Sequence, residues 1–114
     1  MKLETFINKL RSTPKAIEFS ETMAVIEANY NFMPTAFKNG ELQNEAGQNS
    51  GSCKLFAFAK LQSFTKEETL ACFGQYYFDE VLNDLNGTGH QNIRNFMNTG
   101  FDGLVFEGEP LIEK

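Results

Sequence analysis

The segment from Ser52 to Leu61, SCKLFAFAKL, is apolar on nearly every side and constrains the fold more than any other part of the chain. A helix without a polar face must be surrounded by other elements, so the segment predicts a buried central helix. A buried strand is the alternative, because period alone does not separate the two for a short apolar run. The chain also has 12 Phe, 3 Tyr and no Trp. Phenylalanine has no polar group to satisfy, so we expect most of these rings to form the core.

Hydrophobic periodicity predicts two helices before this segment. Apolar residues recur at helical spacing within residues 3–10 and again within residues 19–30. Between them, Thr13 followed by Pro14 is typical of a helix start, with the hydroxyl as N-cap and the proline in the first turn.

Two more helices are predicted after the central segment. Thr65 and Glu68 form a capping box, and the helix that it begins carries apolar residues as far as Leu85. Gly74 inside this helix predicts a kink, a break or a close helix crossing, because glycine weakens a helix interior. A short last helix is expected to end at Gly100.

The remaining segments predict a small amount of β-structure. Asn39-Gly40, within residues 35–44, is a strong hairpin signal, residues 44–52 form a polar loop, and residues 101–106 have strand character and could pair with the hairpin. We therefore expect a mainly helical α+β fold, with about five helices and a small hairpin or a two- to three-stranded sheet. The 114 residues fit one domain spanning 1–114.

Composition and spacing argue against several kinds of partner. The formal net charge is -5 and the ten Lys and Arg are scattered, so we expect no nucleic acid. No apolar run approaches the ~20 residues of a membrane span, and no signal peptide is apparent, so we expect no membrane. Cys53, Cys72 and His90 lack paired zinc-ligand spacing. We therefore expect no metal and no cofactor, with reduced thiols in a cytoplasmic protein.

Cys53 and His90 are the candidate catalytic residues. Cys53 lies at the predicted start of the central helix, where free amide groups, the helix dipole and Lys54 would favour a thiolate. His90 could act as the base, and Asn92 could orient its imidazole. The competing interpretation, which we favour, is that Cys53 is a small core residue, because free cysteine is commonly buried.

Polar side chains from two regions predict a ligand surface. The candidates are Asn39, Asn44, Gln48, Asn49, Ser52 and Lys54 from the first region, and Tyr76, Tyr77, Asn92 and Arg94 from the second. Amides bind sugars, peptides or neutral amides without adding charge, and an arginine can hold a carboxylate bidentately. The alternative, which we favour for the polar residues of the first region other than Lys54, is that these side chains satisfy backbone groups in an irregular loop. A shared site requires the fold to bring the two regions together.

Several stretches, in a fixed order, resemble the HopJ family of bacterial proteins, which are named as type III secretion effectors. These stretches are Pro34–Gly40, Ala46–Lys54, Leu70–Gly74, Gln75–Tyr77 and His90–Met97. The resemblance covers nearly the whole chain and implies a small bacterial domain, but it implies no particular reaction. Two positions depart from the family pattern: Gly89 precedes the histidine where the family has an acid, and Phe101 replaces a tryptophan.

The resemblance and the residues together predict a HopJ-like binding or interaction module, with a protein partner or a small polar ligand. The alternative is a cysteine-dependent enzyme that uses Cys53 and His90 on an amide or an ester. Helical periodicity begins at Leu3, where secreted effectors usually have a disordered, serine-rich leader, so we expect a cytoplasmic protein. Secretion into a host cell by a type III system, with a host target, is the alternative location.

Overall fold

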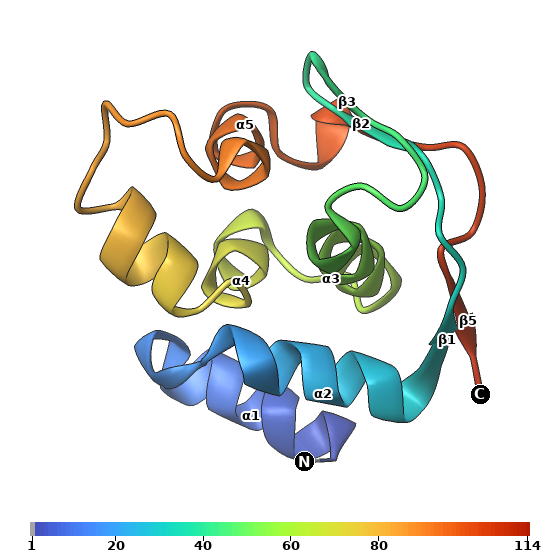
Figure 1. Cartoon of the computed structure of the whole chain (residues 1–114). Helices are drawn as coiled ribbons and strands as arrows, with labels where there is room; N and C mark the ends of the chain where they lie inside the picture. Colours follow the sequence, from blue (N-terminus) through green and yellow to red (C-terminus); the bar gives the residue numbers. More distant parts are fainter. Residues whose placement is uncertain (1) are drawn as a thin grey trace.

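The computed structural model describes residues 2–114 and has an α+β fold arranged around one helix (Figure 1). This helix, α3 (Ser50–Leu61), lies between α1 and α2 on one side and α5 with the hairpin on the other. The other α-helices of the described residues are α1 (Leu3–Ser12), α2 (Phe19–Asn29), α4 (Lys66–Ala71) and α5 (Gln91–Thr99). Every side chain from Leu55 to Ala59 is buried. The prediction of a buried central helix is therefore confirmed.

Two small antiparallel sheets complete the fold. The strands β2 (Phe37–Asn39), β3 (Leu42–Asn44) and β4 (Leu104–Phe106) form one sheet in the order β3-β2-β4. Its hairpin turn contains Gly40 at a φ of 62°, in the left-handed region that favours glycine. The predicted hairpin and its pairing with the tail are confirmed. The second sheet joins β1 (Tyr30–Phe32) to β5 (Leu111–Glu113) and was not predicted.

The start of α2 differs from the prediction. Pro14 begins a separate short 3-10 helix, η1 (Pro14–Ala16), and the Thr13 hydroxyl donates to the carbonyl of Lys9 at 3.2 Å instead of capping. The helix α2 begins later, where the Glu21 carboxylate accepts the N–H of Glu18 at 2.9 Å. A carboxylate can satisfy a free N–H at a helix start as well as a hydroxyl can.

The capping box at Thr65 and Glu68 is confirmed, since each side chain accepts the other residue's N–H. The long helix predicted after it is broken at Gly74, which has a φ of 60°. A Cβ on Gly74 would lie 2.6 Å from the backbone nitrogen of Phe19, so the start of α2 packs directly against this glycine. Beyond it the chain continues as the π-helical segment η2 (Tyr76–Val81). The α5 helix ends at Gly100 as expected, and a short 3-10 helix, η3 (Gly100–Gly103), leads into β4.

The core is built from phenylalanine rings that meet at Phe56 of α3. Its ring centroid lies 4.9 Å from that of Phe96 in α5, 5.4 Å from that of Phe73 and 6.2 Å from that of Phe37 in β2. One side chain therefore contacts rings from three other parts of the fold. No helix within residues 2–114 is long and apolar enough to cross a membrane.

Candidate functional site

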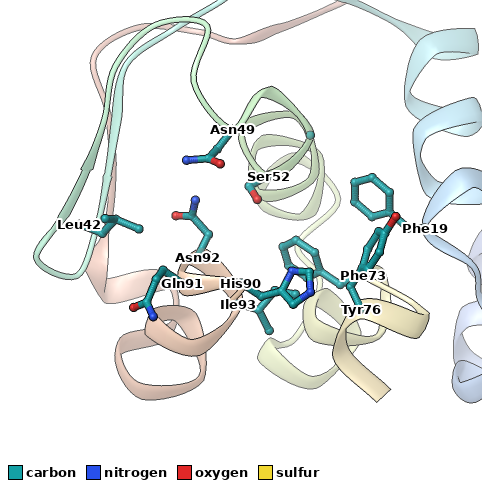
Figure 2. A pocket seen from close by; sticks show the side chains of 11 residues that line it. Phe19, Leu42, Asn49, Ser52, Phe73, Tyr76, His90, Gln91, Asn92 and Ile93 are labelled. Atoms are coloured by element: carbon teal, nitrogen blue, oxygen red, sulfur yellow. The ribbon is translucent and has the colours of Figure 1, made fainter. Parts of the chain in front are cut away.

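A cavity of about 600 Å³ opens between the N-terminal ends of α3 and α5 and the beginning of η2 (Figure 2). Its lining residues are Phe19, Leu42, Asn49, Gly51, Ser52, Phe73, Tyr76, His90, Gln91, Asn92 and Ile93. The rings of Phe19, Phe73 and Tyr76 lie on one side together with the His90 imidazole, and the amides of Asn49 and Asn92 lie on the other side. None of these eleven described residues is Lys, Arg, Asp or Glu. The cavity is thus bounded mainly by neutral groups.

The two helices that open into the cavity start in the same unusual way. Asn49 precedes α3 with a φ of 50°, and His90 precedes α5 with a φ of 54°. Both are left-handed conformations, which asparagine and histidine adopt more readily than most residues. Neither side chain caps its own helix. The first N–H groups of both helices have no partner within a helix, and Gly51, Ser52, Gln91 and Asn92 of these first turns line the cavity.

A cluster of asparagine side chains ties the hairpin to both helix starts. Asn44 and Asn92 form a reciprocal amide pair: the Asn44 nitrogen donates to the Asn92 oxygen at 3.2 Å, and the Asn92 nitrogen donates to the Asn44 oxygen at 3.0 Å. Asn49 donates to the same Asn44 oxygen at 2.7 Å. Asn39 donates to the Asn92 backbone carbonyl at 2.8 Å. We call these four side chains the asparagine network.

Asn39 and Asn44 are therefore found behind the cavity wall and do not line it. Both are fully buried, at 0% and 1% exposure, and Asn39 Oδ1 has no hydrogen-bond partner within residues 2–114. Their expected role as direct ligand contacts is corrected to one of holding Asn49 and Asn92 in place. The cause is the hairpin, whose register turns both amides inward.

His90 contacts a carboxylate that was not predicted from the sequence. Its Nε2 lies 2.9 Å from Oε1 of Glu80 in η2, and because a carboxylate only accepts, Nε2 carries the proton. The imidazole also lies against the ring of Tyr76, with 5.3 Å between centroids. Glu80 thus supplies the orienting acid that is missing at Gly89.

Arg94 binds backbone carbonyls of the loop before His90 and does not line the cavity. Its guanidinium donates to the backbone carbonyls of Gly89 at 2.5 Å and of Asp84 at 2.7 Å. These bonds hold the loop that ends at His90. The expectation that Arg94 binds a ligand carboxylate in this site is corrected, because Arg94 does not line the cavity and its Nε and Nη1 donate to the backbone.

Cys53 lies outside the cavity and within the core. Its side chain is 1% exposed, and its sulfur donates to the Thr35 carbonyl at 3.6 Å. Burial raises the pKa of the Cys53 thiol to about 11, although the bond to the Thr35 backbone opposes the rise. This corrects the expectation that the helix start and Lys54 would favour a thiolate, because burial disfavours the charged form of the thiol.

The other predicted residues outside the cavity are on different surfaces. Lys54 is paired with Glu27 at 3.6 Å and lies over the Phe32 ring. Gln48 accepts the Glu45 N–H within the loop, and Tyr77 lies in a separate hollow beside α1 and α4. Helix geometry explains why Lys54 and Tyr77 do not line the cavity although Ser52 and Tyr76 do, because residues close together in a helix can face different directions. No group of three His, Cys, Asp or Glu side chains in residues 2–114 is arranged to hold a metal ion.

Five predicted residues do line one cavity: Asn49, Ser52, Tyr76, His90 and Asn92. They come from both of the regions that the sequence analysis singled out, and the fold brings these regions together. The lining residues that were not predicted are Phe19, Leu42, Gly51, Phe73, Gln91 and Ile93. The apolar members follow the same periodicity as core residues, so nothing in the sequence marked them. Gln91 could have been included, because it is the amide directly beside His90.

Comparisons with known proteins agree with this architecture. The family described as HopJ type III effector protein matches residues 3–111 of the chain. A crystal structure described as that of the unknown function protein VPA0580 has 54% sequence identity, covers 100% of this chain and 95% of its own, and superposes with a TM-score of 0.98. None of the curated proteins compared with the chain matches it significantly.

Proposed function

Because the chain belongs to the HopJ type III effector protein family, we propose that it acts as a small, non-enzymatic binding module of that family. The cavity between α3, α5 and η2 is its ligand site. The observation that carries this proposal is the convergence of Asn49 and Ser52 with Tyr76, His90 and Asn92 on one cavity. A small polar ligand is the partner that this cavity suits.

The size and lining of the cavity support binding of a small molecule. Ligand sites in proteins typically occupy about 300–1,000 Å³ and combine apolar walls with a few placed polar groups. Here the volume is about 600 Å³, and the lining residues include the buried side chains of Phe73, Ile93 and Asn92. The asparagine network and the Glu80–His90 contact hold the polar groups before any ligand arrives. Such preorganisation reduces the entropy lost on binding.

The alternative, catalysis by Cys53 with His90, has less support. A thiol nucleophile has to be ionised and reachable, whereas Cys53 is buried, has a raised pKa and does not line the cavity that contains His90. Replacing Cys53 with alanine separates the two proposals. A binding module keeps its affinity in this variant, and a thiol enzyme loses turnover.

A fragment screen by NMR tests the binding proposal. Small neutral compounds are added to the ¹⁵N-labelled chain, and we expect the amide signals of Gly51, Ser52 and Gln91 to shift together. Ser52→Phe fills the cavity and should abolish these shifts. Ser50→Phe is the matched control, since Ser50 is in the same turn but does not line the cavity. A screen in which all binding compounds act elsewhere, or survive Ser52→Phe, would refute the proposal.

Family membership further supports the proposal that the protein is delivered into a host cell by a type III system. The whole chain fused to a translocation reporter should then enter host cells only when the bacterium has a functional secretion system. Equal signals from wild-type and secretion-deficient bacteria would instead place the protein in the bacterial cytoplasm.

A further inference from the structure

We propose that the cavity selects a small aromatic carboxamide, a ligand whose amide group both donates and accepts hydrogen bonds. This inference rests on the proposed function and adds the chemical class of the ligand. Three features of the cavity support it: an acceptor of fixed orientation, nearby donors, and an aromatic wall.

The acceptor is the side-chain oxygen of Asn49, and the asparagine network fixes its direction. The Asn44 nitrogen faces the backbone carbonyls of Phe37 and Leu42, at 3.5 and 3.4 Å. A carbonyl only accepts, so the Asn44 amide cannot be reversed, and its oxygen must face Asn49 and Asn92. Both of these donate to it, at 2.7 and 3.0 Å.

It follows that the side-chain nitrogen of Asn49 donates to Asn44. The side-chain oxygen of Asn49 therefore points away from the asparagine network. Figure 2 shows the Asn49 oxygen on the side of Ser52, with the nitrogen directed away from it. Asn49 lines the cavity, and its oxygen accepts no hydrogen bond from another group within residues 2–114. Asn49 is exposed, so water can satisfy this oxygen in the free chain. A ligand that displaces this water loses a hydrogen bond unless it offers a donor at this point.

The donors lie one helical turn further on. The Ser52 hydroxyl points into the cavity, and the N–H groups of Gly51 and Ser52 belong to the unsatisfied first turn of α3. A ligand oxygen can accept from these groups while an adjacent ligand N–H donates to Asn49. A primary carboxamide carries this donor and acceptor on neighbouring atoms.

The aromatic wall accommodates a flat ring attached to the amide. Phe19 meets Tyr76 edge-on, with 5.2 Å between centroids, and lies nearly parallel to Phe73, at 6.2 Å. Tyr76 in turn lies against His90. Offset-stacked and edge-on contacts with such rings stabilise an aromatic ligand beyond the burial of its area.

A carboxylate ligand fits this site less well than a carboxamide. The first turns of α3 and α5 would attract an anion, but the Asn49 oxygen would face a second acceptor, and no lysine or arginine lines the cavity. The net charge of the chain is also -5. The ratio of the affinities for an amide and for the corresponding acid therefore measures the contribution of the Asn49 contact.

Benzamide and benzoate provide the test, because they have the same ring and nearly the same shape. Both are titrated into the ¹⁵N-labelled full chain at pH 7, and dissociation constants are taken from the shifts of Gly51, Ser52 and Gln91. We expect benzamide to bind at least about ten-fold more tightly, the scale of one satisfied hydrogen bond against two opposed acceptors. Asn49→Ala removes the acceptor and should reduce this preference to about two-fold or less.

Gln48→Ala is the matched control, since Gln48 is the preceding amide and lies outside the cavity. It should leave the preference unchanged. Equal or tighter binding of benzoate, or a preference that survives Asn49→Ala, overturns the inference. If other neutral fragments shift the cavity signals and benzamide does not, the ligand class is wrong and the binding site stands. If no fragment shifts them, the proposed function fails as well.

Discussion

At the scale of single residues, the chemistry of a side chain depends on how deeply the fold buries it. Cys53 follows the first turn of α3, where a free thiol would be acidified, yet its sulfur is sealed against Thr35. Ser52, its neighbour in sequence, faces the cavity. The sequence correctly indicated a polar site near this turn, but it could not show which of two adjacent residues points outward, because that depends on a rotation of the helix against its neighbours.

The pKa of about 11 for Cys53 leads to a prediction about its reactivity. Iodoacetamide should modify the native chain slowly at pH 7, with no rate midpoint below that of an ordinary thiol, and His90→Ala should not alter the rate. Stability should also depend on pH: the contribution of Cys53 is complete below the unfolded value near 9 and is lost as the pH rises toward 11. We expect this loss to be about 1–2 kcal/mol.

Two measurements check this prediction. Alkylation is followed by mass spectrometry in native buffer and in denaturant, where both cysteines should react quickly. Urea denaturation at pH 8 and pH 10.5 is compared between the wild type and Cys53→Ala, and the wild type should lose more stability. Rapid native alkylation with a midpoint near pH 7 would restore the thiol-enzyme hypothesis.

At the scale of helices and strands, local signals predicted the elements whose ends are set by local hydrogen bonds. The capping box at Thr65, the Asn39-Gly40 turn and the glycine at position 100 each specify a boundary through nearby backbone groups. The expected N-cap at Thr13 failed because a second solution, Glu18 with Glu21, was available four residues beyond Pro14. The π-helical turn of η2 was also not foreseen, although it carries both Tyr76 and Glu80 to the site.

Gly74 gives the sharpest test at this scale. Gly74→Ala places a methyl group within 2.6 Å of the Phe19 nitrogen and 2.8 Å of the Ile17 carbonyl, in a backbone conformation that disfavours a side chain. We expect it to reduce the free energy of unfolding by at least about 2 kcal/mol. Gly89→Ala is the control, since its Cβ would meet no atom within 4 Å, and its change should stay within about 0.5 kcal/mol. The free energies of unfolding of both variants are measured by urea denaturation. Equal values for Gly74→Ala and Gly89→Ala would show that α2 does not pack against Gly74 as described.

At the scale of the whole molecule, two parts that the sequence did not reveal, the second sheet and the cavity, join distant segments. The pairing of β1 with β5 brings residues from opposite ends of the chain into register, with Tyr30 opposite Glu113. Neither strand has a turn or an alternation strong enough to identify it alone. The cavity is similar, because its walls come from α2, the hairpin, α3, η2 and α5. The class of fold followed from patterns within segments, whereas the shape of the site required the packing between them.

The packing of phenylalanine rings at Phe56 predicts that the chain unfolds as one unit. Phe56→Ala removes a fully buried ring that contacts α5, β2 and Phe73, and such truncations cost about 3–5 kcal/mol. A small domain has only about 5–15 kcal/mol of stability, so this one change should greatly weaken the fold. Leu61→Ala, on the same helix but 57% exposed, should change stability by no more than about 0.5 kcal/mol.

Urea unfolding followed by both circular dichroism and tyrosine fluorescence tests the prediction, since the chain has no tryptophan and Tyr30 is buried. Coincident transitions are expected in the wild type and in both variants, because one hydrophobic core takes residues from every α-helix and from both sheets. Two separated transitions, or a loss below about 1.5 kcal/mol for Phe56→Ala, would mean that the helices and the sheets have separate cores. The cavity would then lie across a joint between independent parts, and its preorganisation would no longer follow from the stability of the fold.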